Sequence, residues 1–205
     1  MEKIIHQVWV GKYKMPERER EFCQHLKNIN NCEYILWTGP DSDMPDAFKH
    51  LYERFYAVND FAFCADLLRI WYVYKHGGFY FDVDWEIKKP IDDFFAHDGV
   101  FFYHSEQDHT IPNNIFGSKK CSDVLKYCVN QVTPDYNWYG PSWFGAVVKQ
   151  YINLEYTSPQ NLVKEKLAQL NFSYQVYYEF EKEYGGHRSL YSWSPENKKK
   201  FAENE

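Results

Sequence analysis

The sequence predicts an α/β fold with a mostly parallel central sheet flanked by helices. The chain has 205 residues, which is about the length of one domain. Apolar residues make up 44% of it and charged residues 25%, as in ordinary globular proteins. Short β-rich apolar runs alternate with helix-like segments, and this alternation is typical of a layered fold with a parallel sheet. We therefore expect one domain over residues 1–195 and a polar tail over residues 196–205.

Each element before the middle of the chain has a local signal. Residues 4–10 form an apolar run that ends at Gly11 and predict a first strand; we interpret His6 within it as a hydrogen-bonded core residue. Further expected elements are a helix over 17–28, a strand over 34–37 before Gly39-Pro40, and a helix over 45–56 with proline at its start.

The strongest predicted element is a helix that ends at His76. Asn59 or Asp60 can cap its start, and Gly77 stops it. Its core-facing stripe recurs at spacings of four, three and four: Phe63, Leu67, Ile70 and Tyr74. The remaining expected elements are strands over 78–81, 100–103 and 114–116, and helices over 121–131 and 143–151.

Composition excludes several classes of protein. The formal net charge is −6, from 23 basic and 29 acidic residues, which argues against a nucleic-acid partner bound by bulk charge. No stretch approaches 18 apolar residues, so we expect no transmembrane segment. Five cysteines without a CxxC pair favour a reducing compartment, and we expect a cytoplasmic protein. The 20% of aromatic residues suit either a filled core or a sugar or nucleotide site.

The segment GGFYFDVDWEIKKP ends a predicted strand in acid. On an extended chain Asp82 and Asp84 share one face, with Cα atoms about 6.5–7 Å apart. Two such carboxylates repel each other unless a positive charge lies between them, and a hard divalent cation fits that position. Ligand sites of open α/β sheets also form at the carboxyl ends of strands. The alternative is a turn in which the two acids only solvate the strand exit.

A charged pair precedes this segment on the predicted helix. Asp66 and Arg69 are three residues apart, on a helix that is apolar nearly all round. Buried charges need partners, so the pair forms either a self-satisfied salt bridge or a grip on a polar ligand. The tight Gly77-Gly78 connection to the acidic strand end favours the ligand.

Four blocks of sequence resemble the DxD glycosyltransferases of family 32. The string ADLLRIWYVYKHGGFYFDVDWEI is similar to the core of that family, and KIIHQVWVG to its first strand. WYGPSWF and GGHRSLYSW are similar to two later elements, and all four blocks follow the family order. The resemblance implies a GT-A fold and a hexosyltransferase that moves a hexose, with retention, from a nucleotide sugar to a glycan or glycolipid acceptor.

The same resemblance implies roles for individual residues. Asp82 and Asp84 would hold Mn²⁺ or Mg²⁺ on the donor diphosphate, while Asp66 and Arg69 would bind hydroxyls of the donor sugar. The implied third metal ligand or diphosphate contact is His187, with Ser189 and Glu183 as alternatives for the ligand. The remaining implied donor contacts are Trp9 stacked on the base, Val8 and Val10 beside it, Asn114 near the sugar, and Ser189, Ser192 and Trp193 over the phosphates.

Two other functions compete with the transferase. A catalytically silent sugar-nucleotide or glycan-binding module would have the same fold, but the intact Asp82/Asp84 pair argues against it. A phosphatase of the haloacid-dehalogenase type also carries DxD at a strand end, yet that motif normally lies near the N-terminus and does not continue as Trp85-Glu86. For the donor we expect UDP-galactose or UDP-glucose first and GDP-mannose second.

Overall fold

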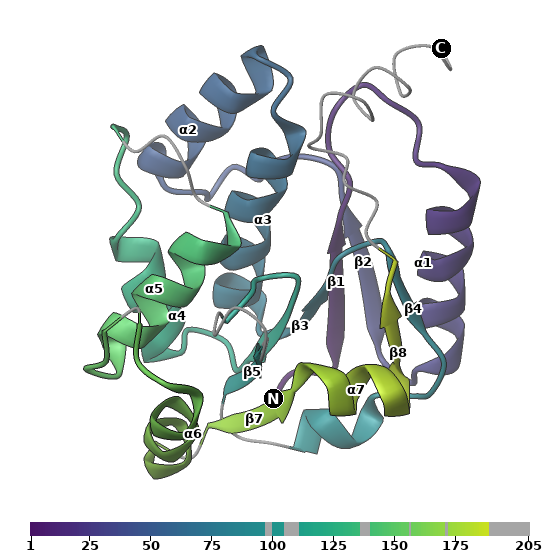
Figure 1. Ribbon diagram of the computed structural model, residues 1–205. Helices are drawn as coiled ribbons and strands as arrows, with labels where there is room; N and C mark the ends of the chain where they lie inside the picture. The colour runs from purple at the N-terminus through teal and green to yellow at the C-terminus, as the bar shows by residue number, and fades with distance from the viewer. Residues whose placement is uncertain (97–99, 105–110, 136–139, 156, 171, 189–205) are drawn as a thin grey trace.

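A six-stranded sheet with the order β2-β1-β3-β6-β5-β7 forms the centre of the computed structural model (Figure 1). The structure describes residues 1–96, 100–104, 111–135, 140–155, 157–170 and 172–188. The strands are β1 Ile4–Val8, β2 Glu33–Trp37, β3 Gly78–Phe81, β5 Val100–His104, β6 Ile115–Ser118 and β7 Ser173–Val176. Only β6 runs against its neighbours, β3 and β5; the other pairings are parallel. The predicted mostly parallel sheet is confirmed.

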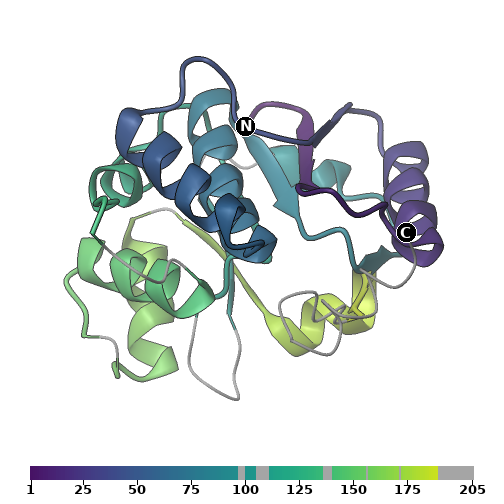
Figure 2. The ribbon, with the colours of Figure 1, turned by 90° about the horizontal axis from the view of Figure 1, so that it is seen from above.

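Helices cover both faces of this sheet. The helices are α1 Glu17–Ile29, α2 Asp46–Ala57, α3 Phe61–His76, α4 Asp123–Asn130, α5 Pro141–Tyr151, α6 Gln160–Gln169 and α7 Tyr177–Tyr184, with a 3₁₀ helix over Asp92–Ala96. Figure 2 shows α1 and α2 on opposite sides of the sheet. No helix among the described residues has the length and apolar character that crossing a membrane requires.

Two apolar cores follow from the alternation of side chains along β3. Tyr80 points into the larger core, which contains the buried residues of α2 to α6. Phe79 and Phe81 point the other way, into a core built with α1, the 3₁₀ helix and Phe180 of α7. The strand is buried on both faces, as expected for a central strand of an α/β sheet.

The connection from α3 to β3 reverses the chain within two glycines. Gly77 ends the helix with φ +72° and Gly78 follows with φ +95°, conformations that favour glycine. A Cβ on Gly77 would collide with Glu2, and one on Gly78 with the Ile4 carbonyl. Because β3 returns along α3, the start of the helix and the end of the strand lie at the same edge of the sheet. The helix and its glycine stop were predicted correctly; Asp60 occupies the N-cap position without a side-chain capping bond.

His6 is fully buried on β1, as the sequence predicted for a core residue. Its Nε2 lies 2.7 Å from the Gly77 carbonyl, and Trp37 Nε1 donates to its Nδ1 at 3.0 Å. A carbonyl only accepts, so the proton is on Nε2 and the ring is neutral. Burial, opposed by the Gly77 bond and assisted by His76, lowers the pKa of His6 to about 4.

This burial predicts an acid-sensitive fold. The unfolded chain binds a proton at His6 near pH 6.5, whereas the folded chain does so near pH 4, so stability falls as the pH drops through this window. We expect proton binding to His6 in the unfolded chain to lower the free energy of unfolding by about 2 kcal/mol between pH 7.5 and pH 5. Urea unfolding of wild type and His6→Gln at both pH values measures it. Parallel pH dependences in the two proteins would contradict the assignment.

Candidate active site

The two aspartates lie in a turn rather than on a strand. β3 ends at Phe81, and the Trp85 amide donates to the Asp82 carbonyl at 3.3 Å, which closes a four-residue turn. The expectation that Asp82 and Asp84 share the face of an extended strand is therefore wrong. Their convergence comes instead from the turn and from the short strand β4, Trp85–Ile87, that follows it.

A second, two-stranded sheet brings the C-terminal part of the described chain to this turn. β4 pairs in antiparallel register with β8, Gly185–His187, so that Trp85 lies opposite His187. The Arg188 amide donates to the Asp84 carbonyl at 2.8 Å and continues the pairing. Gly185 has φ +125°, and a Cβ there would collide with the Glu86 carbonyl, so this pairing requires glycine.

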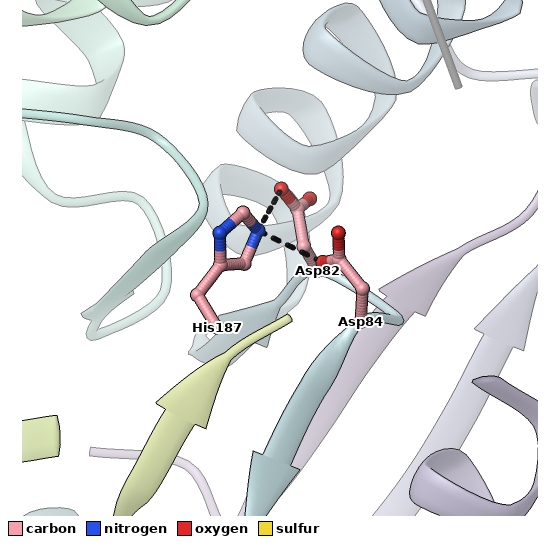
Figure 3. Close-up of side chains that lie close together, drawn as sticks. All are labelled: Asp82, Asp84 and His187. Carbon is pink, nitrogen blue, oxygen red and sulfur yellow. Dashed lines mark ion pairs between the residues drawn. The ribbon is translucent and has the colours of Figure 1, made fainter. Parts of the chain in front are cut away.

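Asp82, Asp84 and His187 converge on one point (Figure 3). His187 Nε2 lies 2.9 Å from Asp84 Oδ1 and 4.0 Å from Asp82 Oδ2, and the three potential ligand atoms all lie within 4.8 Å of one another. Two carboxylates and an imidazole form a donor set that suits Mn²⁺, and the carboxylates also suit Mg²⁺. The residues present therefore fit a divalent cation.

Electrostatics in this cluster also favour a positive charge between the acids. Burial alone lowers the pKa of His187, but the hydrogen bond and charge of Asp84, with the charges of Asp82 and Glu181, raise it above its ordinary value. For Asp82, burial and the Asp84 charge raise the pKa, against the opposing charge of Arg69. A proton on His187 would place one positive charge beside the two carboxylates, and a divalent cation would replace that proton.

Arg69 connects helix α3 to the DxD turn. Its guanidinium lies 3.3 Å from Asp66 and 3.0 Å from Asp82, and it donates to the backbone and side-chain oxygens of Asn113. Asn113 in turn donates to Asp66 at 2.7 Å. Burial raises the pKa of Asp66 to about 6, although the Arg69 charge opposes this. Asp66 and Arg69 therefore form a salt bridge, and Arg69 also pairs with the predicted metal ligand Asp82.

Two members of this network, Tyr80 and Asn113, were not among the predicted site residues. The Tyr80 hydroxyl donates to Asp82 Oδ1 at 2.6 Å, and its ring lies 4.7 Å from the Arg69 guanidinium. Tyr80 precedes Asp82 by two residues, and side chains two apart along a strand point to the same face, which is the signal that could have identified Tyr80. Asn113 contacts Arg69 and Asp66, whereas the predicted Asn114 accepts the Asp82 amide through its backbone. The Asn114 side-chain oxygen is buried and has no hydrogen-bond partner among the described residues.

Trp9, for which the resemblance implies base stacking, lies beside the DxD turn, and its role stays a prediction. It packs, partly buried, against a small cluster that includes Cys23 and Val83. Its indole nitrogen donates to the Tyr13 carbonyl at 2.9 Å, which sets the ring orientation. The side chains of Val8 and Val10 are buried in the larger core and leave only their backbone for a ligand.

The other implied residues divide into two groups. Glu183 is 57% exposed and pairs with Lys89 at 3.6 Å, so the structure does not bring this alternative ligand to the cluster. Ser189, Ser192 and Trp193 lie outside the described residues, as does the polar tail over 196–205. The choice between His187 and Ser189 as ligand therefore stays a prediction, supported for His187 by its position.

Comparisons with known proteins give a consistent result. Residues 16–101 match the family described as glycosyltransferase sugar-binding region containing DXD motif, which spans Asp66 to Asp84 but neither Trp9 nor His187. The PaToxG glycosyltransferase structure is 16% identical with a TM-score of 0.59, covering 82% of this chain and 74% of its own, and shows a shared fold.

A second structure is a glycosyltransferase involved in the glycosylation of the major capsid of PBCV-1. It is 13% identical and covers 84% of this chain and 80% of its own, with a TM-score of 0.34. No curated protein matches the sequence significantly.

Proposed function

We propose that this chain, whose residues 16–101 match the DXD sugar-binding region of glycosyltransferases, transfers a hexose from a nucleotide sugar to a glycan or glycolipid acceptor, with metal dependence and retention of configuration. The observation that carries the proposal is the convergence of Asp82, Asp84 and His187 next to the buried Arg69 network. UDP-galactose or UDP-glucose is the favoured donor and GDP-mannose the second. The five cysteines are free, in keeping with a cytoplasmic role in polysaccharide assembly.

Asp82, Asp84 and His187 would hold Mn²⁺ or Mg²⁺ at the donor diphosphate. When bound, the cation stabilises the negative charge of the departing nucleoside diphosphate. Asp82 keeps one oxygen on Arg69 and Tyr80 and directs the other toward His187, so its carboxylate is held in place from both sides. Fixing the geometry in advance removes the cost of reorganising the site during the reaction.

Asp66 and Arg69 would bind and orient the hydroxyls of the donor sugar. Both side chains are less than a tenth exposed and are already bound to Asn113 and to each other, so few conformations remain open to them. Such fixed positioning supplies a large part of the rate of a transfer reaction. Asn114 contacts the turn through its backbone carbonyl, and its buried side-chain oxygen is the further group that we assign to the sugar.

We assign no covalent nucleophile. In the proposed reaction the acceptor hydroxyl attacks the anomeric carbon from the face that the diphosphate leaves, and the C–O bond to the diphosphate breaks. The acceptor proton passes to the departing phosphate oxygen, so the step needs no protein base. Asp66 pairs with Arg69 at 3.3 Å and accepts a hydrogen bond from Asn113, which suits a binding role.

Replacing Trp9 by alanine is expected to raise the donor KM about tenfold with little change in kcat. Stacking on a base contributes about 1–3 kcal/mol and acts equally in the ground and transition states. Initial rates against donor concentration give both constants. Tyr56→Ala, which removes an aromatic ring that is 42% exposed on α2, is the control and should leave both unchanged. A fall in kcat alone would contradict base stacking.

Donor hydrolysis tests the proposed function directly. Purified protein with Mn²⁺ is incubated with UDP- and GDP-sugars, and free nucleoside diphosphate is measured. We expect release from one donor, abolished by EDTA. Calorimetric binding of UDP without turnover of any donor, even with acceptors supplied, would instead support the silent binding module. The absence of both binding and turnover would contradict the proposal.

A further inference from the structure

Gln7 is a buried amide that contacts the DxD turn. It lies on β1 directly before Val8 and is fully buried. Its Nε2 donates to the Asp82 carbonyl at 3.2 Å. Because a carbonyl oxygen only accepts, the NH₂ end of the amide must face the turn. Chemistry therefore determines the orientation of this side chain.

Tyr34 on the neighbouring strand β2 holds the opposite end of the same amide. Its hydroxyl donates to Gln7 Oε1 at 2.7 Å. Burial raises the pKa of Tyr34 well above its ordinary value, so the hydroxyl keeps its proton and remains a donor. A relay of two hydrogen bonds thus runs from the edge strand β2, through β1, to the backbone of the DxD turn.

The acceptor at the end of this relay is the Asp82 carbonyl oxygen, which also accepts the hydrogen bond that closes the turn. The Asp82 carbonyl accepts hydrogen bonds from both the Trp85 amide and the Gln7 side-chain amide, while the Asp82 amide donates to the carbonyl of Asn114, the residue before β6. On the other side, the Arg188 amide binds the Asp84 carbonyl. Three segments of the chain thus hold the turn, and Gln7 provides the contact from β1, the strand that also leads to Trp9.

We infer that Gln7 is a positioning residue: its amide, oriented by the Tyr34 hydroxyl, holds the Asp82–Trp85 turn so that both carboxylates stay directed at His187. The consequence for metal binding rests on the proposed function; the consequence for the turn does not. Without the amide, the turn carbonyl keeps one bond and the Tyr34 hydroxyl loses its acceptor, so the turn opens more often. Outer groups that orient metal ligands typically contribute about 10–100-fold to metal affinity.

The test compares Gln7→Met and Tyr34→Phe with the control Asn30→Leu. Asn30 is also a buried amide, but it bonds to Leu26 and Ile91, away from the turn. Hydrogen exchange of the Trp85 amide in metal-free protein, followed by NMR, reports on the turn itself. Titration with Mn²⁺, followed by its electron paramagnetic resonance signal, reports on the metal ligands.

We expect Gln7→Met to exchange the Trp85 amide faster and to bind Mn²⁺ about 10–100-fold more weakly. Tyr34→Phe should change both in the same direction by less, and Asn30→Leu should change neither despite a comparable loss in Tm. Unchanged Trp85 exchange in folded Gln7→Met overturns the inference, and Tyr34→Phe decides it if Gln7→Met does not fold. A wild type that binds no Mn²⁺ contradicts the proposed function instead, because the exchange result is independent of metal.

Discussion

Replacing Asp84 by asparagine is expected to lower donor turnover by about 10²- to 10³-fold. The change keeps the size of the side chain and removes its charge, so the ion pair with His187 at 2.9 Å is lost and a carboxylate ligand becomes a weaker amide ligand. Because Asp84 is 6% exposed and its backbone carbonyl is bound by Arg188, the turn itself should persist. The loss therefore reports on the metal site and not on the fold.

The measurement is initial rate against Mn²⁺ concentration for wild type, Asp84→Asn and the control Glu183→Gln. Glu183 precedes β8 and offered an alternative carboxylate ligand, but it is directed to Lys89. We expect Glu183→Gln to behave as wild type. Wild-type turnover of Asp84→Asn with unchanged metal dependence would contradict the assignment, and a loss in Glu183→Gln would transfer the ligand role to that residue.

Replacing Arg69 by methionine should damage stability and activity together. Arg69 is the cation between Asp66 and Asp82, and its removal leaves carboxylates without a partner in a buried site. Breaking a buried pair in this way costs about 3–5 kcal/mol. Urea unfolding measures this loss, and we expect Asp66→Asn in the same chain to recover part of it because one uncompensated charge is removed. An unaltered unfolding free energy in Arg69→Met would contradict the network.

Arg69→Lys separates positioning from stability. Lysine retains the positive charge, so stability should largely return. It lacks the planar fork that reaches Asp66, Asp82 and Asn113 together. We expect turnover to stay about 100-fold below wild type, since small displacements of positioning groups have effects of this size. Wild-type kcat/KM in this variant would show that only the charge matters.

Local patterns predicted the parts of the fold that depend on neighbouring residues. The helix that ends at Gly77, the strand over 78–81 and the proline-started helix before them have signals within a few positions of each element. The acidic pair at the strand exit was recognisable for the same reason. Its geometry was not: a turn and a strand exit have similar local composition, and the Trp85–Asp82 bond selected the turn.

Strands that form only by pairing with residues far away in the sequence were not predicted. β4 and β8 have three residues each and carry no periodicity, and their register exists only because the chain around residue 186 returns to residue 86. Strand β7, which joins the sheet by pairing with β5, and the helix α7 that follows it were also not predicted. The resemblance implied His187 as a ligand, but only this pairing brings its Nε2 within 4.0 Å of a carboxylate oxygen of each aspartate.

The sequence by itself determined the α/β class, the mostly parallel sheet, the buried Asp66/Arg69 helix and the acidic pair after β3, because hydrophobic periodicity, glycine stops and charge within apolar runs are local properties. Tertiary structure alone decided that Arg69 reaches Asp82, that Asn113 joins it, and that Gln7 holds the turn. Those contacts join residues 13 to 75 positions apart, and the register of a sheet, which no local pattern specifies, brings them together.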